Sequence, residues 1–412
     1  MSQRRAGRHA LIVGGSMSGL LAAIMLLKRG WRVDVFERVG GELAGRGAGI
    51  VAQPELIARL SGLGLSVRDL GVSIARRQIL DSEGRTIATG TRPQVMTAWE
   101  RVYRILRDAL PADRYHRGCE LEEFQQDDGR VFARFGDGKT WEADILIGAD
   151  GLRSTVRQQC LPAVVPLYAG YVAWRALIPE SALPAAVHDD VFEALTFCLP
   201  PREQFLGYPV AGPDNDLRPG RRRYNIVWYR PADGAYELPR LLTDETGVTH
   251  TISIPPPLIR RDAVDEMRAA AERLLPPQLR AIVRLIDEPL LQPIYDLASP
   301  RLAFGRVAII GDAAFVARPH VGAGVSKAAD DAAVLAQALD AHERVDEALL
   351  QFETERLPEN NRIIERARHL GGYLQATQSA EEHARSVRHS IPEAVLAETA
   401  VLDFLREAKP VY

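Results

Sequence analysis

The stretch HALIVGGSMSGLLAAIMLLKRGWRVDVFE, residues 9–37, decides the fold. Its apolar start predicts a buried strand over 9–13, the run rich in Ala and Leu predicts a helix over 17–29, and residues 31–36 predict a second strand. The turn from Gly14 to Gly19 carries the glycines of a dinucleotide fingerprint, with Ser16 at the middle position. Glu37 follows Gly14 by about twenty residues, a distance at which an acid can hold ribose hydroxyls. The pattern predicts a βαβ unit that binds a dinucleotide.

A second stretch, GRVAIIGDAAFVARPHVGAGVSKAADD at residues 305–331, also joins a strand to a helix. A buried strand is predicted over 307–310, and a helix is predicted to begin near Gly322. Asp312 can accept hydrogen bonds from a sugar-like hydroxyl. The small residues at 322–324 leave backbone amides free at a positive helix end. Such an end suits a flat, electron-accepting ring that becomes anionic.

A third strand, predicted over 140–147, leads into Gly148-Ala149-Asp150-Gly151. Asp150 can cap the following helix or contact a cofactor directly. The exits at Gly14, Gly148 and Gly311 all place glycine beside polar residues, and ligands of open α/β sheets gather at such carboxyl ends. We therefore expect the three exits to converge on one ligand.

The remaining pattern predicts an α/β fold with a Rossmann-like parallel sheet, an antiparallel second sheet and a helical tail. A hairpin over 71–90 and a helix over 97–110 precede strands at 119–124 and 131–135, which form a small antiparallel excursion. Later strands and helices are predicted at 168–177, 191–198, 203–210, 222–229, 263–275, 278–287, 290–295 and near 393–407. The expected division is a first part of the dinucleotide domain at 1–165, a substrate domain at 166–298, the second part at 299–370, and a tail at 371–412. The tail is expected to brace the domains or form a homodimer contact.

Composition narrows the classes of function. The 412 residues carry a net charge of −3, which gives no electrostatic reason to expect nucleic acid or an anionic membrane as partner. Three cysteines without metal-ligand spacing favour reduced thiols in the cytoplasm, and they indicate no metal. The apolar run from Leu11 to Leu27 imitates a signal peptide, but glycines and serines interrupt it early and it is short for a membrane span. We expect no export.

Taken together, these motifs resemble the single-component FAD-dependent aromatic hydroxylases, the group A flavoprotein monooxygenases typified by para-hydroxybenzoate hydroxylase. The resemblance covers most of the chain, and stretches at 13–16, 49–56, 168–175 and 317–320 are most similar to the dihydroxypyridine hydroxylases within that family. It implies that Glu37 binds the adenosine ribose, Asp312 the ribityl chain, and residues 322–326 the pyrimidine edge of the flavin. The family usually has His where this chain has Phe315, and often Asn where it has Ser326. An arginine is common at the start of the helix predicted over 97–110, where this chain has Trp99, and Arg101 nearby is the candidate for that role. The expected cofactor-binding residues are Gly14, Ser16, Met17, Ser18, Glu37, Arg38, Gln53, Arg101, Asp150, Asp312, Pro319, Gly322, Ala323, Gly324, Val325 and Ser326.

The family chemistry implies NADH or NADPH as a transient co-substrate, O2, and a flavin C4a-hydroperoxide that survives only in a dry pocket. An electron-rich aromatic substrate attacks it, so a base or proton relay is expected. His320 is the leading catalytic candidate, with Tyr208 as an orienting group. Phe315, Tyr224, Trp228 and Pro319 are the expected substrate contacts, with core packing as the other reading of the tyrosine and the tryptophan. The alternatives are an FAD-dependent oxidase or reductase without oxygen insertion, and a flavin-binding protein without turnover.

Overall fold

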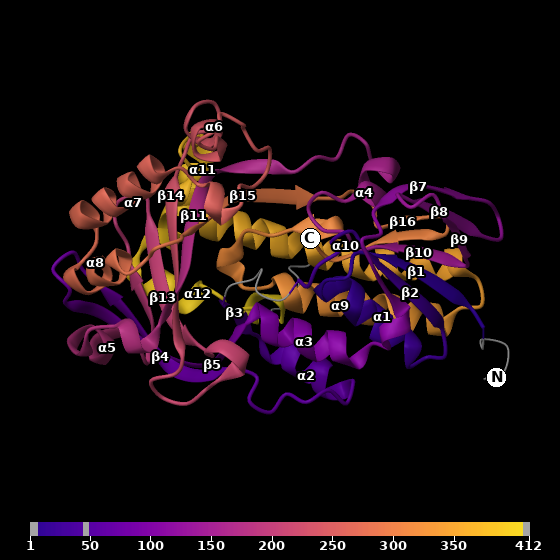
Figure 1. Ribbon diagram of the computed structural model, residues 1–412, viewed down its shortest axis with the longest axis horizontal. Coiled ribbons are helices and arrows are strands. Elements are labelled where there is room, and N and C mark those ends of the chain that lie inside the picture. Colours follow the sequence, from indigo (N-terminus) through magenta and orange to yellow (C-terminus); the bar gives the residue numbers. More distant parts are fainter. Residues whose placement is uncertain (1–6, 44–48, 407–412) are drawn as a thin grey trace.

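A computed structural model describes residues 7–43 and 49–406 of the chain. It contains two large sheets, which lie toward opposite ends of the long axis, and a small third sheet (Figure 1). The sequence has a glycine-rich loop over 40–49, which is also expected to line a ligand; it falls partly at 44–48, outside the described residues. Among the described helices, none has the length and apolar character needed to cross a membrane.

The six-stranded sheet contains the strands that the glycine motifs follow. Its order is β16 (Ala303–Phe304), β17 (Val307–Ile309), β10 (Ile145–Gly148), β1 (His9–Val13), β2 (Arg32–Glu37) and β6 (Tyr115–Arg117). All neighbours are parallel except β16 and β17. Because β1 lies beside β10 and β10 beside β17, Val13, Gly148 and Ile309 are in register. The three predicted exits therefore lie side by side, as expected.

A three-stranded excursion joins β7 (Leu121–Gln126), β8 (Val131–Phe135) and β9 (Thr140–Ala143). One continuous strand was predicted over 140–147, and this was wrong. The chain changes sheets at Asp144, whose backbone N–H donates to His9 O at 2.9 Å and whose carboxylate accepts from His9 N at 2.7 Å. These bonds end β9 and begin β10 in the large parallel sheet.

The nine-stranded sheet draws on both halves of the chain. Its order is β18 (Phe315–Val316), β15 (Leu290–Ala298), β11 (Leu167–Pro179), β14 (Arg223–Pro231), β13 (Gln204–Val210), β12 (Ala194–Cys198), β4 (Val72–Leu80), β5 (Thr86–Ala98) and β3 (Gly49–Ala52). Strands β3, β4 and β5 come from the segment expected to belong to the dinucleotide domain. Residues 1–165 therefore do not lie wholly in that domain.

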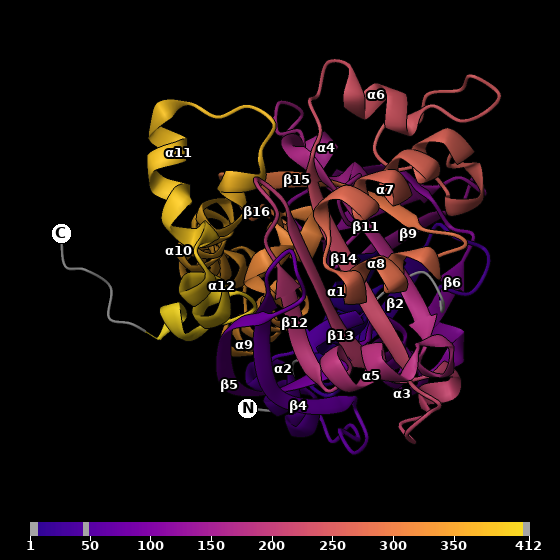
Figure 2. The same ribbon diagram turned by 90° about the vertical axis from the view of Figure 1, so that its left-hand side faces the viewer.

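Helices cover one face of the nine-stranded sheet. They are α5 (Ala185–Val191), α6 (Glu237–Leu242), α7 (Arg261–Leu274) and α8 (Pro277–Arg284), and Figure 2 shows α7 and α8 across the strands. Trp174, Tyr224 and Trp228 pack in the core beneath these helices. Because side chains alternate along a strand, Val227 and Tyr229 face the other side, toward the middle of the molecule.

The remaining helices connect the two sheets. The α1 helix (Met17–Leu27) packs on α9 (Gly324–Ala341), and α10 (Val345–Gly371) contacts α9 as well as β15 and β16. Shorter helices are α2 (Pro54–Gly62), α3 (Trp99–Ala109), α4 (Thr155–Cys160), α11 (Ala380–Ser386) and α12 (Pro392–Glu398). The final helix is shorter than predicted: it ends at Glu398, because Thr399 is extended (φ −68°, ψ 129°) and Ala400 follows with a positive φ of 55°.

Candidate active site

A long cleft opens at the carboxyl edge of the parallel sheet. One cavity of about 250 Å³ is lined by Gly14, Glu37, Arg38 and Asp150. A second cavity, of about 410 Å³, extends from the start of α1 to the face of the nine-stranded sheet. The two share lining residues: Ser16, Trp99, Ala149 and Gly151. They therefore form one elongated site between the two sheets.

The glycine turn before α1 is built for close backbone contact. Gly14 has φ of 107°, and a Cβ there would lie 2.2 Å from Ala149 O. A Cβ on Gly19 would lie 1.9 Å from Gly14 O. The α1 helix has no capping side chain and no acid in its first turn, and Ser16, Met17 and Ser18 line the cleft. Free N–H groups at a helix start suit a pyrophosphate.

The acid at the end of β2 is held rigidly. Glu37 Oε2 accepts from Gly15 N–H at 2.9 Å, and Oε1 accepts from Val39 N–H at 2.9 Å. On the opposite wall, Asp150 accepts from Ser154 Oγ at 2.5 Å and Thr155 N–H at 2.7 Å, so it caps α4 while lining the cleft. The position of Asp150 is therefore compatible with both predicted roles, a cap of the following helix and a direct contact with a cofactor.

The turn after β17 faces the middle of the cleft. Gly311 has φ of 59°, and a Cβ there would lie 2.0 Å from Ser18 Oγ. Asp312 lines the cavity. The α9 helix begins without a capping side chain or an early acid, and Pro319, Gly322, Ala323, Gly324 and Val325 border the same space. A second uncapped helix start thus meets the cleft where a flat ring would lie. Ser326 is buried and does not line the cavity.

The far wall is supplied by the nine-stranded sheet. Arg175 of β11 donates from Nη1 to Gln292 Oε1 at 2.9 Å and from Nη2 to Gly49 O at 3.2 Å. Its Nε is buried without a hydrogen-bond partner, and within residues 7–43 and 49–406 its guanidinium bonds only Gln292 and Gly49, with no carboxylate. Tyr208 and the apolar Leu206 line the same wall. Burial raises the pKa of Tyr208 to about 12 although Arg175 opposes this, so its hydroxyl remains protonated.

His320 lines the cavity, but its ring nitrogens are occupied by the protein. Gln204 Oε1 can only accept, so the histidine donates from Nδ1 at 3.1 Å and its Nε2 accepts from the Tyr171 hydroxyl at 3.0 Å. Burial, reinforced by Arg318, lowers the pKa of His320 to about 3. A neutral ring with both nitrogens bonded is a poor proton acceptor. The structure therefore favours an orienting role over the predicted catalytic base.

Several predicted contacts lie away from the cleft. Tyr224 and Trp228 pack under the covering helices, and Phe315 is buried in the core of the parallel sheet. Arg101 lines a separate cavity beside Arg104 and Arg223. Residues two apart on a helix point roughly 200° apart, so the presence of Trp99 in the cleft directs Arg101 away from it.

Gln53 acts as a structural link. Its Nε2 donates to Gly322 O at 3.3 Å and Ala400 O at 3.1 Å, and its side chain does not line the cleft.

Residues that sequence reasoning missed include Arg175, Gln292 and Trp99, which line the cleft, and Asn225, whose Oδ1 accepts from Gly49 N–H at 3.0 Å. The one available signal for Arg175 was a charge within the strand predicted at 168–177. Nothing local indicated which face of that strand would line the cleft.

A Rossmann-like sheet with two uncapped helix starts on one cleft, faced by a mainly antiparallel sheet, fits the class of enzymes that bind FAD. Residues 168–296 match a family described as FAD binding domain-like, and residues 294–367 match one described as FAD binding domain. The chain is 32% identical to 2,6-dihydroxypyridine 3-monooxygenase of Paenarthrobacter nicotinovorans over 93% of this chain and 95% of the relative. It is 30% identical to 3-amino-4-hydroxybenzoate 2-monooxygenase of Streptomyces cremeus over 87% of this chain and 86% of the relative.

A solved structure of 2,6-dihydroxypyridine-3-hydroxylase from Arthrobacter nicotinovorans superposes with a TM-score of 0.85 at 31% identity, covering 90% of this chain and 94% of that one. The chain belongs to the FAD-dependent aromatic monooxygenases. It is an NAD(P)H-dependent flavoprotein that hydroxylates an aromatic ring. Because its relatives are monooxygenases, the comparisons favour oxygen insertion over the alternatives of an oxidase or reductase and of a flavin-binding protein without turnover.

Proposed function

We propose that the substrate is an aromatic ring with an ionisable hydroxyl, of the hydroxypyridine or phenol type, bound as its anion. The observation that carries this proposal is Arg175, a half-buried cation on the cavity wall that lacks an acidic partner in the described chain. Enclosing an unpaired charge is costly. An anionic ring would supply the counter-charge, and the guanidinium would give its oxygen a charge-assisted hydrogen bond.

Deprotonation also serves the chemistry, because it makes the ring a stronger nucleophile. FAD, once reduced by NADH or NADPH, supplies the activated oxygen that the ring attacks. Arg175 would hold the ring oxygen, and the protonated Tyr208 hydroxyl would donate a second hydrogen bond to it. Leu195, Leu206 and Val227 supply an apolar wall that excludes water. His320, kept neutral, would orient the ring edge through its fixed position.

The test is a panel of hydroxypyridines, phenols and hydroxybenzoates assayed for accelerated NAD(P)H oxidation, with mass detection of one added oxygen. Arg175→Met should raise the KM for the accepted ring at least about tenfold, the loss expected for one charge-assisted contact, with FAD content unchanged. Arg76→Met, an exposed arginine of the same sheet, is the matched control and should leave KM unchanged. An unchanged KM in Arg175→Met would remove the anionic substrate from the proposal.

We further propose that the nicotinamide co-substrate docks transiently, which is supported by a single dinucleotide-type βαβ unit in the described chain. Comparing NADH with NADPH in the same assay selects between them. A homodimer and a cytoplasmic location are part of the proposal, and sedimentation of the purified protein tests the first.

A further inference from the structure

A glutamine beside Arg175 presents its side-chain amide to the cleft. Gln292 belongs to β15 and lies opposite Ala173 of β11, two residues before Arg175. Side chains two residues apart on a strand share a face, so Gln292 and Arg175 lie on the same side of the sheet, and both line the cavity. Arg175 Nη1 donates to Gln292 Oε1 at 2.9 Å. The two side chains therefore form one polar unit on the cavity wall.

This hydrogen bond sets the direction of the amide. A guanidinium has donors and no acceptor, so the atom of Gln292 that faces Arg175 must be its oxygen. The amide nitrogen then points elsewhere, and it has no acceptor within residues 7–43 and 49–406. Arg175 is itself fixed by a second bond, from Nη2 to Gly49 O at 3.2 Å. Gln292 thus offers an oriented and unused N–H donor to the occupant of the cleft.

Arg175 and Gln292 together present donors to two neighbouring atoms of a ligand. Under the proposed function, the Arg175 guanidinium holds the ionised ring oxygen. The Gln292 nitrogen shares a carbon with the oxygen that Arg175 holds, so it lies beside the guanidinium and can reach an atom next to the ring oxygen. A C–H group at that place would leave the amide unpaired in an enclosed site, which is costly. The wall therefore favours a ligand with a second acceptor there.

The charges of the cavity wall limit what that acceptor can be. Among the described lining residues the cations are Arg175 and Arg318, and Arg318 is already paired with Asp296 at 2.8 Å. One ionised oxygen matches the cation that remains. A carboxylate as second acceptor would bring another negative charge into the cavity. A ring nitrogen accepts through its lone pair and adds no charge.

We propose that Gln292 is a specificity-determining residue, which selects an aromatic anion whose ring nitrogen is adjacent to the ionised hydroxyl. Loss of the hydroxyl proton spreads the negative charge over the oxygen and that nitrogen, so both atoms accept from the two donors. A phenol has a C–H at the same place and leaves the Gln292 amide unpaired. This selection rests on the proposed anchoring of the ring anion by Arg175, and within that function it favours hydroxypyridines over phenols.

The experiment measures dissociation constants for 2-hydroxypyridine and for phenol, from flavin absorbance changes of the holoenzyme. The probes differ by a ring nitrogen in place of a C–H, and comparing their ratio between variants cancels their different acidities. Gln292→Met keeps the length of the side chain and removes the donor. It should weaken 2-hydroxypyridine binding about tenfold and leave phenol within about twofold. Gln125→Met, the same substitution at an exposed position of β7, is the control and should change neither.

A charged variant tests the pairing with Arg175. Gln292→Glu places a carboxylate beside the guanidinium, where it would supply the counter-charge that the ring anion otherwise brings. Both probes should then bind at least about tenfold more weakly. FAD content should stay unchanged in both Gln292 variants, because the residue acts on the substrate. Unchanged binding of both probes in Gln292→Glu would contradict the pairing.

The outcomes separate this selection from the function on which it rests. Equal losses for the two probes in Gln292→Met, or no loss for either, would overturn the selection of a ring nitrogen. Tighter binding of the hydroxypyridine in that variant would also overturn it, because a protonated ring nitrogen would then face the amide. Unchanged binding of both probes in Arg175→Met would contradict the anionic substrate itself. Weak binding in Arg175→Met with an unchanged ratio in Gln292→Met would overturn the role of Gln292 alone.

Discussion

Gly371, at the end of α10, sets the position of two residues beside the cleft. A Cβ at this position would lie 2.4 Å from the Tyr171 hydroxyl and 2.8 Å from Cδ2 of His320. Gly371→Ala should therefore displace the His320 ring, lower stability by about 1–3 kcal/mol, and divert NAD(P)H oxidation toward hydrogen peroxide. Thermal melting and the ratio of hydroxylated product to NAD(P)H consumed measure the two effects.

Gly62 is the matched control for that substitution. It also lies in a helix, α2, but a Cβ there would meet nothing within 4 Å. Gly62→Ala should leave coupling unchanged and stabilise the protein by about 0.5–1 kcal/mol, because alanine loses less chain entropy in a helix. Equal coupling in the two alanine variants would show that the Tyr171–His320 pair does not govern the chemistry.

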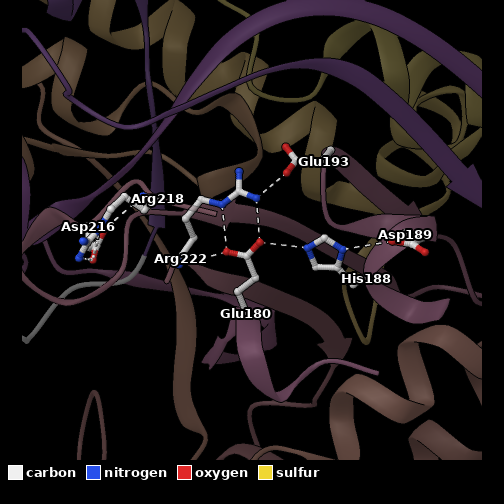
Figure 3. Close-up of polar contacts among 7 residues, drawn as sticks. All are labelled: Glu180, His188, Asp189, Glu193, Asp216, Arg218 and Arg222. Carbon is white, nitrogen blue, oxygen red and sulfur yellow. Dashed lines mark hydrogen bonds and ion pairs between the residues drawn. The ribbon is translucent and has the colours of Figure 1, made fainter. Parts of the chain in front are cut away.

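At the scale of elements, an ion cluster with a buried Glu180–Arg222 pair at its centre joins the end of β11 to the start of β14. Figure 3 shows the Arg222 guanidinium between Glu180 and Glu193, with His188 on the other side of Glu180. Burial alone would raise the pKa of Glu180, but hydrogen bonds from Arg222 and His188 outweigh it and lower the pKa from 4.5 to about 2. Arg222 Nη2 and Glu180 Oε1 are 2.8 Å apart.

This cluster predicts a pH dependence of stability. The Glu180 carboxylate is more acidic when folded, so its stabilisation is complete above about pH 4.5 and is lost as the pH falls toward 2. Glu180→Gln should lower the free energy of unfolding by about 2–3 kcal/mol at pH 7 and flatten its slope below pH 5. Urea unfolding at several pH values measures both. An unchanged acid slope would mean that other carboxylates dominate.

At the scale of the whole molecule, the chain just beyond α12 forms part of the wall of the cleft. Thr399 and Ala400 line the cavity. Ala400 N–H donates to His320 O at 2.7 Å, and Arg77 of β4 donates to Thr399 O at 3.0 Å. A helical tail was predicted to brace the domains. These contacts join it to β4 of the nine-stranded sheet and to the turn before α9, and bracing between domains stays a prediction.

Shortening the chain to end at Ser390 should open the cleft to water. We expect FAD binding to weaken by about tenfold and the hydrogen peroxide share of turnover to rise, because water exclusion is lost. Arg77→Met removes the hydrogen bond to Thr399 O without shortening the chain. It should also weaken FAD binding and raise the hydrogen peroxide share, but by less. FAD titration and peroxide assay are the measurements, and full coupling in the shortened chain would contradict a closing role.

Local sequence alone predicted the βαβ unit, the glycine-bearing ends of the three strands and the family, because glycine turns and acids at strand ends are short-range signals that backbone sterics enforce. The pairing that sets those three ends side by side joins strands far apart in sequence. Periodicity also located most strands of the second sheet. It could not show that Arg175 rather than Trp228 faces the cleft, since alternation defines two faces of the sheet without saying which one the helices cover.

The tertiary structure decided that question when α7 and α8 packed on one face of the nine-stranded sheet and left the other for the cleft. It also brought Gln292 within hydrogen-bonding distance of Arg175, 117 residues earlier in sequence, by pairing β15 with β11. Such contacts depend on which strands pair and on how helices pack against them. No pattern along the chain carries that information.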